Sequence, residues 1–83
     1  MTQTICGVDI SSRTLDVSLG ARHLEAQFPN TLEGIRALAQ FCLTHNVTLV
    51  AMEATGGYEQ KAQHGLTAAG LAVAILNPRA VRQ

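Results

Sequence analysis

Two acidic residues stand where a folded chain does not place a charge without some compensation. Asp9 lies inside the apolar run of residues 5–10, and Glu53 ends a second apolar run, residues 49–52. Removing an unpaired charge from water is expensive, so such a carboxylate is normally offset by a metal ion, a cation or a proton-sharing carboxylate. Carboxylate oxygens are ligands that Mg²⁺ and Mn²⁺ favour. Asp9 and Glu53 are therefore the candidate catalytic and metal-binding residues.

A simpler interpretation of the same two residues stays open at this point. Asp9 could cap the turn that Ser11 and Ser12 begin, and Glu53 could be the last, solvated residue of a strand. Spacing alone does not separate these two interpretations. The arrangement of the surrounding elements decides whether the carboxylates meet.

Hydrophobic periodicity predicts the elements that position the two carboxylates. The run around Asp9 is apolar on both faces, which is typical of a central strand, and the alternation after it indicates an antiparallel neighbour. The expected strands cover residues 4–10, 14–19, 23–28, 48–53 and 71–76. The expected helices cover residues 31–45 and 57–69, the first with Asn30 as N-cap and Glu33 as its capping-box partner. Asn77 and Pro78 predict the start of a third helix.

This order of elements predicts an α/β fold with one mixed five-stranded sheet. Three meandering strands and two crossover units fit the strand order 3-2-1-4-5, with strand 2 antiparallel to the rest. Right-handed crossovers then place both helices on the same face. The strands that carry Asp9 and Glu53 become parallel neighbours, and both carboxylates lie at the carboxyl edge, where open α/β sheets bind ligands. The second face remains for a partner to cover, so we expect a symmetric homodimer.

Composition excludes several classes of protein. The 83 residues form at most one domain, and six Lys and Arg balance six Asp and Glu, so there is no global positive field that would attract nucleic acid. Binding of nucleic acid would need a local patch. No apolar run is long enough to span a bilayer and no basic leader precedes one, so the expected location is the cytoplasm. Gly56 and Gly57 are not followed by Gly-Lys-Ser/Thr, which excludes a P-loop.

Five short motifs in the chain resemble a known family in order and spacing. They are Gly7-Val-Asp9-Ile-Ser11, Thr14-Leu-Asp16-Val, Phe28-Pro-Asn30-Thr, Met52-Glu53-Ala-Thr-Gly-Gly-Tyr58-Glu59 and Asn77-Pro-Arg79-Ala-Val-Arg82. Together they are similar to the amino-terminal part of the DEDD transposases of the IS110 bacterial insertion sequences, which are relatives of the Piv-type DNA invertases. The resemblance covers essentially the whole chain.

The resemblance implies an RNase H-like catalytic domain, similar to RuvC-type Holliday junction resolvases, of which residues 1–83 are the amino-terminal part. Four acidic residues in such domains bind Mg²⁺ or Mn²⁺ and act on DNA. Asp9 matches the first and Glu53 the second, whereas the other two and the family's serine nucleophile belong beyond Gln83. The implied partners of the full-length bacterial protein are DNA and a guide RNA. We expect residues 1–83 alone to hold metal weakly and to be inactive.

Candidate contacts to nucleic acid complete the expected site. Ser11, Ser12 and Tyr58 lie next to the two carboxylates in the sequence, and Arg79 and Arg82 are three residues apart on the expected third helix. Hydroxyl and guanidinium groups at such positions suit phosphate oxygens.

Two other classes of protein remain possible from the residues. In an actin-like or sugar-kinase-like ATPase, Asp9 would hold Mg²⁺ and the hydroxyls of Ser11, Ser12 and Thr14 would contact phosphates. That fold needs a second Asp-Gly hairpin, whereas Glu53 precedes Ala-Thr-Gly-Gly and a helix. The third class is a non-catalytic dimerisation module.

Overall fold

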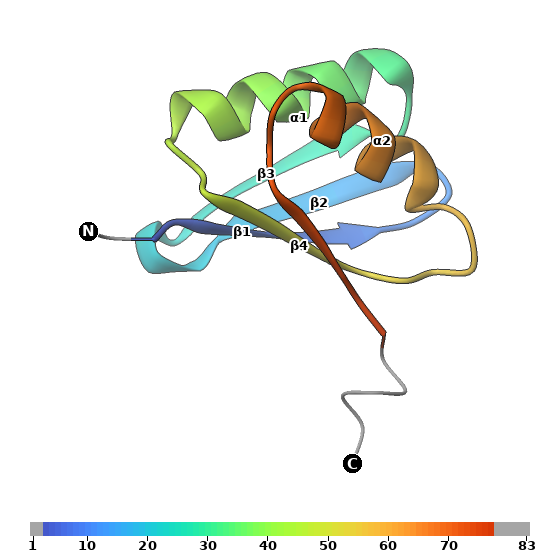
Figure 1. Ribbon diagram of the computed structural model, residues 1–83, viewed down its shortest axis with the longest axis horizontal. Helices are drawn as coiled ribbons and strands as arrows, with labels where there is room; N and C mark the ends of the chain where they lie inside the picture. Colours follow the sequence, from blue (N-terminus) through green and yellow to red (C-terminus); the bar gives the residue numbers. More distant parts are fainter. Residues whose placement is uncertain (1–2, 78–83) are drawn as a thin grey trace.

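The computed structural model describes residues 3–77, and the expected third helix lies outside them. Its elements follow one another as two hairpins and two crossover units (Figure 1). In chain order they are β1 (Ile5–Ile10), β2 (Thr14–Leu19), the 3-10 turn η1 (Gly20–Arg22), β3 (Leu24–Pro29), α1 (Leu32–Thr44), β4 (Leu49–Glu53), α2 (Gln60–Ala68) and β5 (Val73–Leu76).

The strands form one mixed sheet in the order β3-β2-β1-β4-β5. β2 pairs antiparallel with β1 and β3, whereas β4 pairs parallel with β1 and β5. Both helices lie on the same face of the sheet, as right-handed crossovers require (Figure 1). The predicted strand order, strand directions and helix placement are all confirmed.

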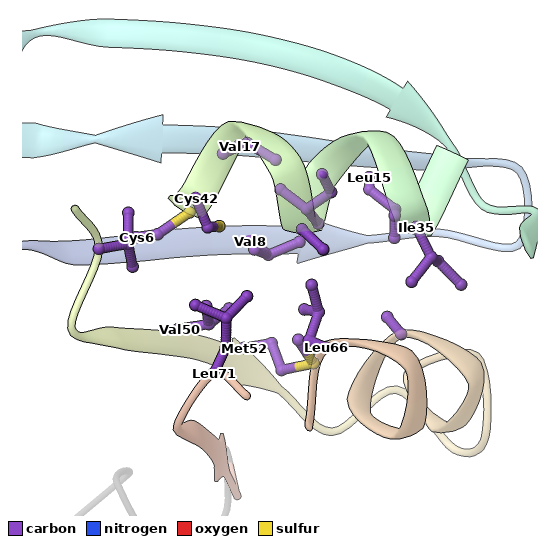
Figure 2. Close-up of a cluster of buried hydrophobic side chains, with 14 of the residues drawn as sticks. Cys6, Val8, Leu15, Val17, Ile35, Cys42, Val50, Met52, Leu66 and Leu71 are labelled. Atoms are coloured by element: carbon purple, nitrogen blue, oxygen red, sulfur yellow. The ribbon is translucent and has the colours of Figure 1, made fainter. Parts of the chain in front are cut away.

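The core lies between that face of the sheet and the two helices (Figure 2). Successive side chains of a strand point to opposite faces, so alternate residues of each strand enter the core. On the sheet side these are chiefly aliphatic side chains from β1, β2 and β4, and α1 and α2 cover them with their apolar stripes. The largest fully buried side chains are Leu15, Leu19, Leu38, Met52, Leu66, Val50, Cys6 and Cys42.

Two thiols meet inside this core. Cys6 of β1 and Cys42 of α1 are both free and buried. Hydrogen bonding to Cys42 and burial raise the pKa of the Cys6 thiol. Both thiols are fully enclosed by the core, so the pair packs as small hydrophobic groups.

The first helix begins one residue later than its predicted cap implies. Thr31 is the N-cap, because its Oγ1 accepts a hydrogen bond of 3.0 Å from the Gly34 amide. Asn30 was expected in this role, but its backbone amide donates to the carbonyl oxygen of Arg13 at 2.8 Å. Asn30 thus continues the pairing of the β2–β3 hairpin past Pro29. The predicted capping box is wrong because hairpin pairing takes the amide that Glu33 would have bound.

Neither helix in the described part of the chain has the length and apolar character of a membrane-spanning segment.

Candidate functional site

Asp9 and Glu53 lie on neighbouring parallel strands and share one face of the sheet. Val8 of β1 pairs with Met52 of β4, and both side chains are buried beneath the helices. Because side chains alternate along a strand, the next residue in each, Asp9 and Glu53, faces the opposite side. Both residues are exposed. The prediction that these carboxylates occupy adjacent strands at the carboxyl edge of the sheet is confirmed.

A shallow depression on this open face contains the two carboxylates. Its other lining residues come from four neighbouring strands and include Asp16 and Ser18 of β2, Ala51 of β4 and Leu76 of β5. The depression has an acidic part at Asp9, Asp16 and Glu53 and an apolar part at Ala51 and Leu76. A hydrated cation or the charged backbone of a ligand would fit the first part better than the second.

Asp16 is a third carboxylate on this face and was not among the predicted site residues. It stands directly opposite Asp9 in the β1–β2 pairing, and its Oδ1 accepts a hydrogen bond of 2.7 Å from Gln27 Nε2. The alternation of residues 14–19 already assigned Asp16 to the polar face of its strand. Only the register of the hairpin brings it next to Asp9.

The carboxylate oxygens of Asp9 and Glu53 are ligands of the type that a hard cation prefers, but they are few. Within residues 3–77 no group of three or more His, Cys, Asp or Glu side chains is arranged to hold a metal ion. Asp9 and Glu53 would therefore supply at most part of an octahedral shell, and Mg²⁺ would keep several waters.

The turn after Asp9 is closed by Ser11 rather than by Asp9. Ser11 Oγ accepts hydrogen bonds from the Thr14 amide at 2.9 Å and from the Arg13 amide at 3.3 Å, and it lies 2.9 Å from Thr14 Oγ1. Among the described residues no hydrogen bond is made to the Asp9 carboxylate, so this group is free for a ligand. The interpretation of Asp9 as a turn cap is wrong, because the serine hydroxyl already fills that role.

The loop after Glu53 is held by a carboxylate of its own. Glu59 Oε1 accepts hydrogen bonds from Thr55 Oγ1 at 2.7 Å, from the Thr55 amide at 3.0 Å and from the Gly57 amide at 3.1 Å. These bonds, the Thr55 hydroxyl first, lower the pKa of Glu59 from its ordinary 4.5 to about 2. The loop also needs φ angles of 88° at Gly56 and 136° at Gly57, which glycine adopts readily. For this reason α2 begins at Gln60 and not at residue 57.

The predicted nucleic-acid residues are only partly brought together. Ser12 and Tyr58 line a second small depression with Asn30, Gly57 and Lys61. Tyr58 is 55% exposed, which suits a contact to a ligand better than a core role. The predicted contacts Arg79 and Arg82 lie outside the described residues.

Comparison with solved structures defines the class of fold. The chain is similar to T. thermophilus RuvC in a structure of that protein in complex with a Holliday junction substrate, with a TM-score of 0.69 at 14% sequence identity. The match covers 99% of this chain and 69% of RuvC. The protein therefore has an RNase H-like fold of the RuvC type.

Comparison with family models identifies the family. Residues 6–83 match the model of the IS110-type DEDD transposases, described as a transposase. The chain belongs to this transposase family, as its motifs predicted. Among curated proteins no significant sequence match is found.

Proposed function

We propose that the protein is the amino-terminal part of the catalytic domain of a DEDD DNA transposase, which cleaves and transfers DNA strands with the help of Mg²⁺ or Mn²⁺. The observation that carries this proposal is the position of Asp9 and Glu53 at the carboxyl ends of adjacent parallel strands, on an open face of the sheet. Membership in the transposase family and the RuvC-type fold support the choice of DNA as substrate.

In this proposal Asp9 and Glu53 hold the cation. Their carboxylates are exposed and offer oxygen ligands to a metal ion. The strands that carry them are packed into the core on their other side, so the backbone at both residues is well anchored. A bound divalent ion would polarise a phosphate oxygen and stabilise the negative charge that develops during strand cleavage. Ser11, Ser12 and Tyr58 would contact the nucleic-acid backbone beside the cation, together with Arg79 and Arg82.

The small donor set limits what this chain does alone. Two converging carboxylates leave most of the metal shell to water, so we expect weak binding of Mg²⁺ and Mn²⁺ and no cleavage of DNA by residues 1–83. The family's other two acidic residues and its nucleophile, and with them binding of DNA and guide RNA, would belong to a longer protein. The cytoplasm of a bacterium is the compartment that fits this function.

The alternatives are less well supported. An actin-like or sugar-kinase-like ATPase requires a second phosphate-binding hairpin, but the loop after Glu53 leads directly into α2. A non-catalytic dimerisation module would not account for two unpaired carboxylates at the edge of the sheet. Neither alternative fits the transposase family match.

Titration with Mn²⁺, followed by paramagnetic broadening of amide NMR signals, tests the metal site even when binding is weak. Signals near Asp9 and Glu53 should broaden together, and Asp9→Asn or Glu53→Gln should abolish the effect at both. Glu25→Gln is the matched control, because Glu25 lies on the same face of the sheet, on β3, outside the depression that contains the pair. If Glu25→Gln weakens binding as much as Asp9→Asn, general electrostatic attraction explains the binding and the proposed pair is wrong. DNA cleavage by this chain that disappears in Asp9→Ala would contradict the expected inactivity.

A further inference from the structure

The two strands that carry the carboxylates are not paired with each other at the carboxylates themselves. The pairing of β1 with β4 ends at Val8 opposite Met52, one residue before Asp9 and Glu53. Beyond that point β1 continues only with β2, to Ile10 opposite Leu15. The end of β4 pairs instead with β5. The spacing of the two carboxylates is therefore set by the pairing one residue earlier and by any contact between the loops that follow them.

One side chain connects these loops. Asn30 Nδ2 donates a hydrogen bond of 3.0 Å to the Ser11 carbonyl oxygen and another of 3.2 Å to the Tyr58 carbonyl oxygen. Ser11 is two residues after Asp9, and Tyr58 is five residues after Glu53. Within residues 3–77 no other hydrogen bond joins the turn after β1 to the loop after β4. Asn30 itself is anchored by its backbone amide, which donates to Arg13.

Each of the connected loops also has hydrogen bonds of its own. Ser11 Oγ closes the turn after Asp9, and Glu59 Oε1 closes the loop after Glu53 with three hydrogen bonds. These bonds hold each loop internally but do not join one loop to the other. The Asn30 amide supplies that connection.

The side-chain oxygen of Asn30, Oδ1, indicates that this residue does more than stabilise the fold. Two carbonyl acceptors require the NH₂ group, which fixes the orientation of the amide. Asn30 Oδ1 is then buried without a hydrogen-bond partner among the described residues. A buried acceptor without a partner destabilises a fold. The side chain that occupies this position is thus suited to its two donor bonds and poorly suited to stability alone.

We propose that Asn30 is a positioning residue, which fixes the separation of Asp9 and Glu53 by tying the Ser11 turn to the Tyr58 loop. It touches neither carboxylate and acts through the backbone of the two loops. The role in metal binding rests on the proposed function, whereas the tie between the loops does not.

Three variants separate this role from a general loss of stability. Asn30→Asp keeps the shape and the backbone bond to Arg13 but removes the Nδ2 donor, and Asn30→Ala removes the side chain without adding a charge. Thr31→Ala is the matched control, since it removes the N-cap of α1 next door and leaves both Asn30 bonds in place. The measurements are backbone ¹⁵N order parameters without metal and the Mn²⁺ concentration that half-broadens the Asp9 and Glu53 signals.

We expect lower order parameters at residues 11–14 and 54–59 in both Asn30 variants, and at least a fivefold higher half-broadening concentration of Mn²⁺. The loss in Asn30→Asp is the decisive result, because an added negative charge alone would attract the cation. Thr31→Ala should change neither quantity. If a folded Asn30 variant keeps the wild-type order parameters, the proposal is overturned. If Asp9→Asn, made in the protein that retains Asn30, does not affect Mn²⁺ binding, the proposed metal site is wrong. The order parameters alone then decide whether Asn30 ties the loops.

Discussion

A close backbone approach between α1 and the sheet provides a sharp test of the fold beside the site. Gly34, in the first turn of α1, packs against Pro29 at the end of β3. A Cβ on Gly34 would overlap the Pro29 carbonyl oxygen and lie 2.8 Å from both the Pro29 carbonyl carbon and Pro29 Cγ. Backbone atoms cannot rotate away as a side chain can. Gly34→Ala must therefore push the start of α1 away from β3.

The expected change in the free energy of unfolding combines two destabilising effects and one stabilising effect. Overpacking of this kind costs about 1–3 kcal/mol. Displacing the helix start also strains the Thr31 cap, which is worth about 1 kcal/mol. Alanine returns about 1 kcal/mol through its higher helix propensity. We expect Gly34→Ala to lower the free energy of unfolding by about 1–3 kcal/mol, a large part of the roughly 4–12 kcal/mol available to a chain of this length.

Gly65→Ala is the matched control within the same protein. Gly65 of α2 also packs closely against α1, and its added Cβ would lie 2.6 Å from Ile35 Cγ2. That neighbour is a methyl group on Cβ of the buried Ile35, which moves only with χ1, so Gly65→Ala should also cost some stability, but less than Gly34→Ala because no backbone atom has to move and helix propensity rises. Urea unfolding followed by circular dichroism measures both variants. If Gly34→Ala is as stable as the wild type, α1 does not press on Pro29 and the packing described above is wrong.

Three further predictions concern charge and assembly. Glu59 has a lowered pKa, so its contribution to stability is complete above pH 4.5 and is lost as the pH falls toward 2. In urea unfolding experiments over this pH range, the wild type should lose more stability than Glu59→Gln. Equal losses in the two proteins would contradict the closure of the loop by Glu59. Without metal, Asp9→Asn should leave stability unchanged or slightly raise it, because it relieves repulsion on the acidic face, and a clear loss in thermal melting would show that Asp9 has a structural role. The open face exposes Ile5 by 47% and Leu76 by 43%, so we expect a homodimer that Leu76→Glu dissociates; sedimentation showing a wild-type monomer at high micromolar concentration would refute this.

The sequence alone determined the strand order and the placement of the two carboxylates on adjacent strands. Alternating and continuous apolar runs marked the strands, and the lengths of the connections left few topologies once crossovers had to be right-handed. Because Asp9 and Glu53 end parallel neighbours, their common edge followed from chain order. The transposase motifs around them led to the same family that the family model identifies.

The exact starts of the helices depended on tertiary contacts. Asn30 has the side chain of a good N-cap, but that side chain donates to the carbonyl oxygens of Ser11 and Tyr58, and Thr31 caps α1 instead. The start of α2 moves to Gln60 because Glu59 closes the preceding loop. Local propensity indicates which residues can begin a helix, whereas hydrogen bonds made elsewhere in the fold decide which residue does.

Only the tertiary structure decided the surroundings of the carboxylates. Asp16 joins Asp9 through the register of the β1–β2 hairpin. Asn30 reaches both Ser11 and Tyr58, which lie 19 and 28 residues away along the chain. Hydrophobic periodicity reports which face of an element is buried, because burial acts on each residue separately. A hydrogen bond between distant loops depends on the packing of the whole sheet against α1 and α2, and no local pattern in the sequence records it.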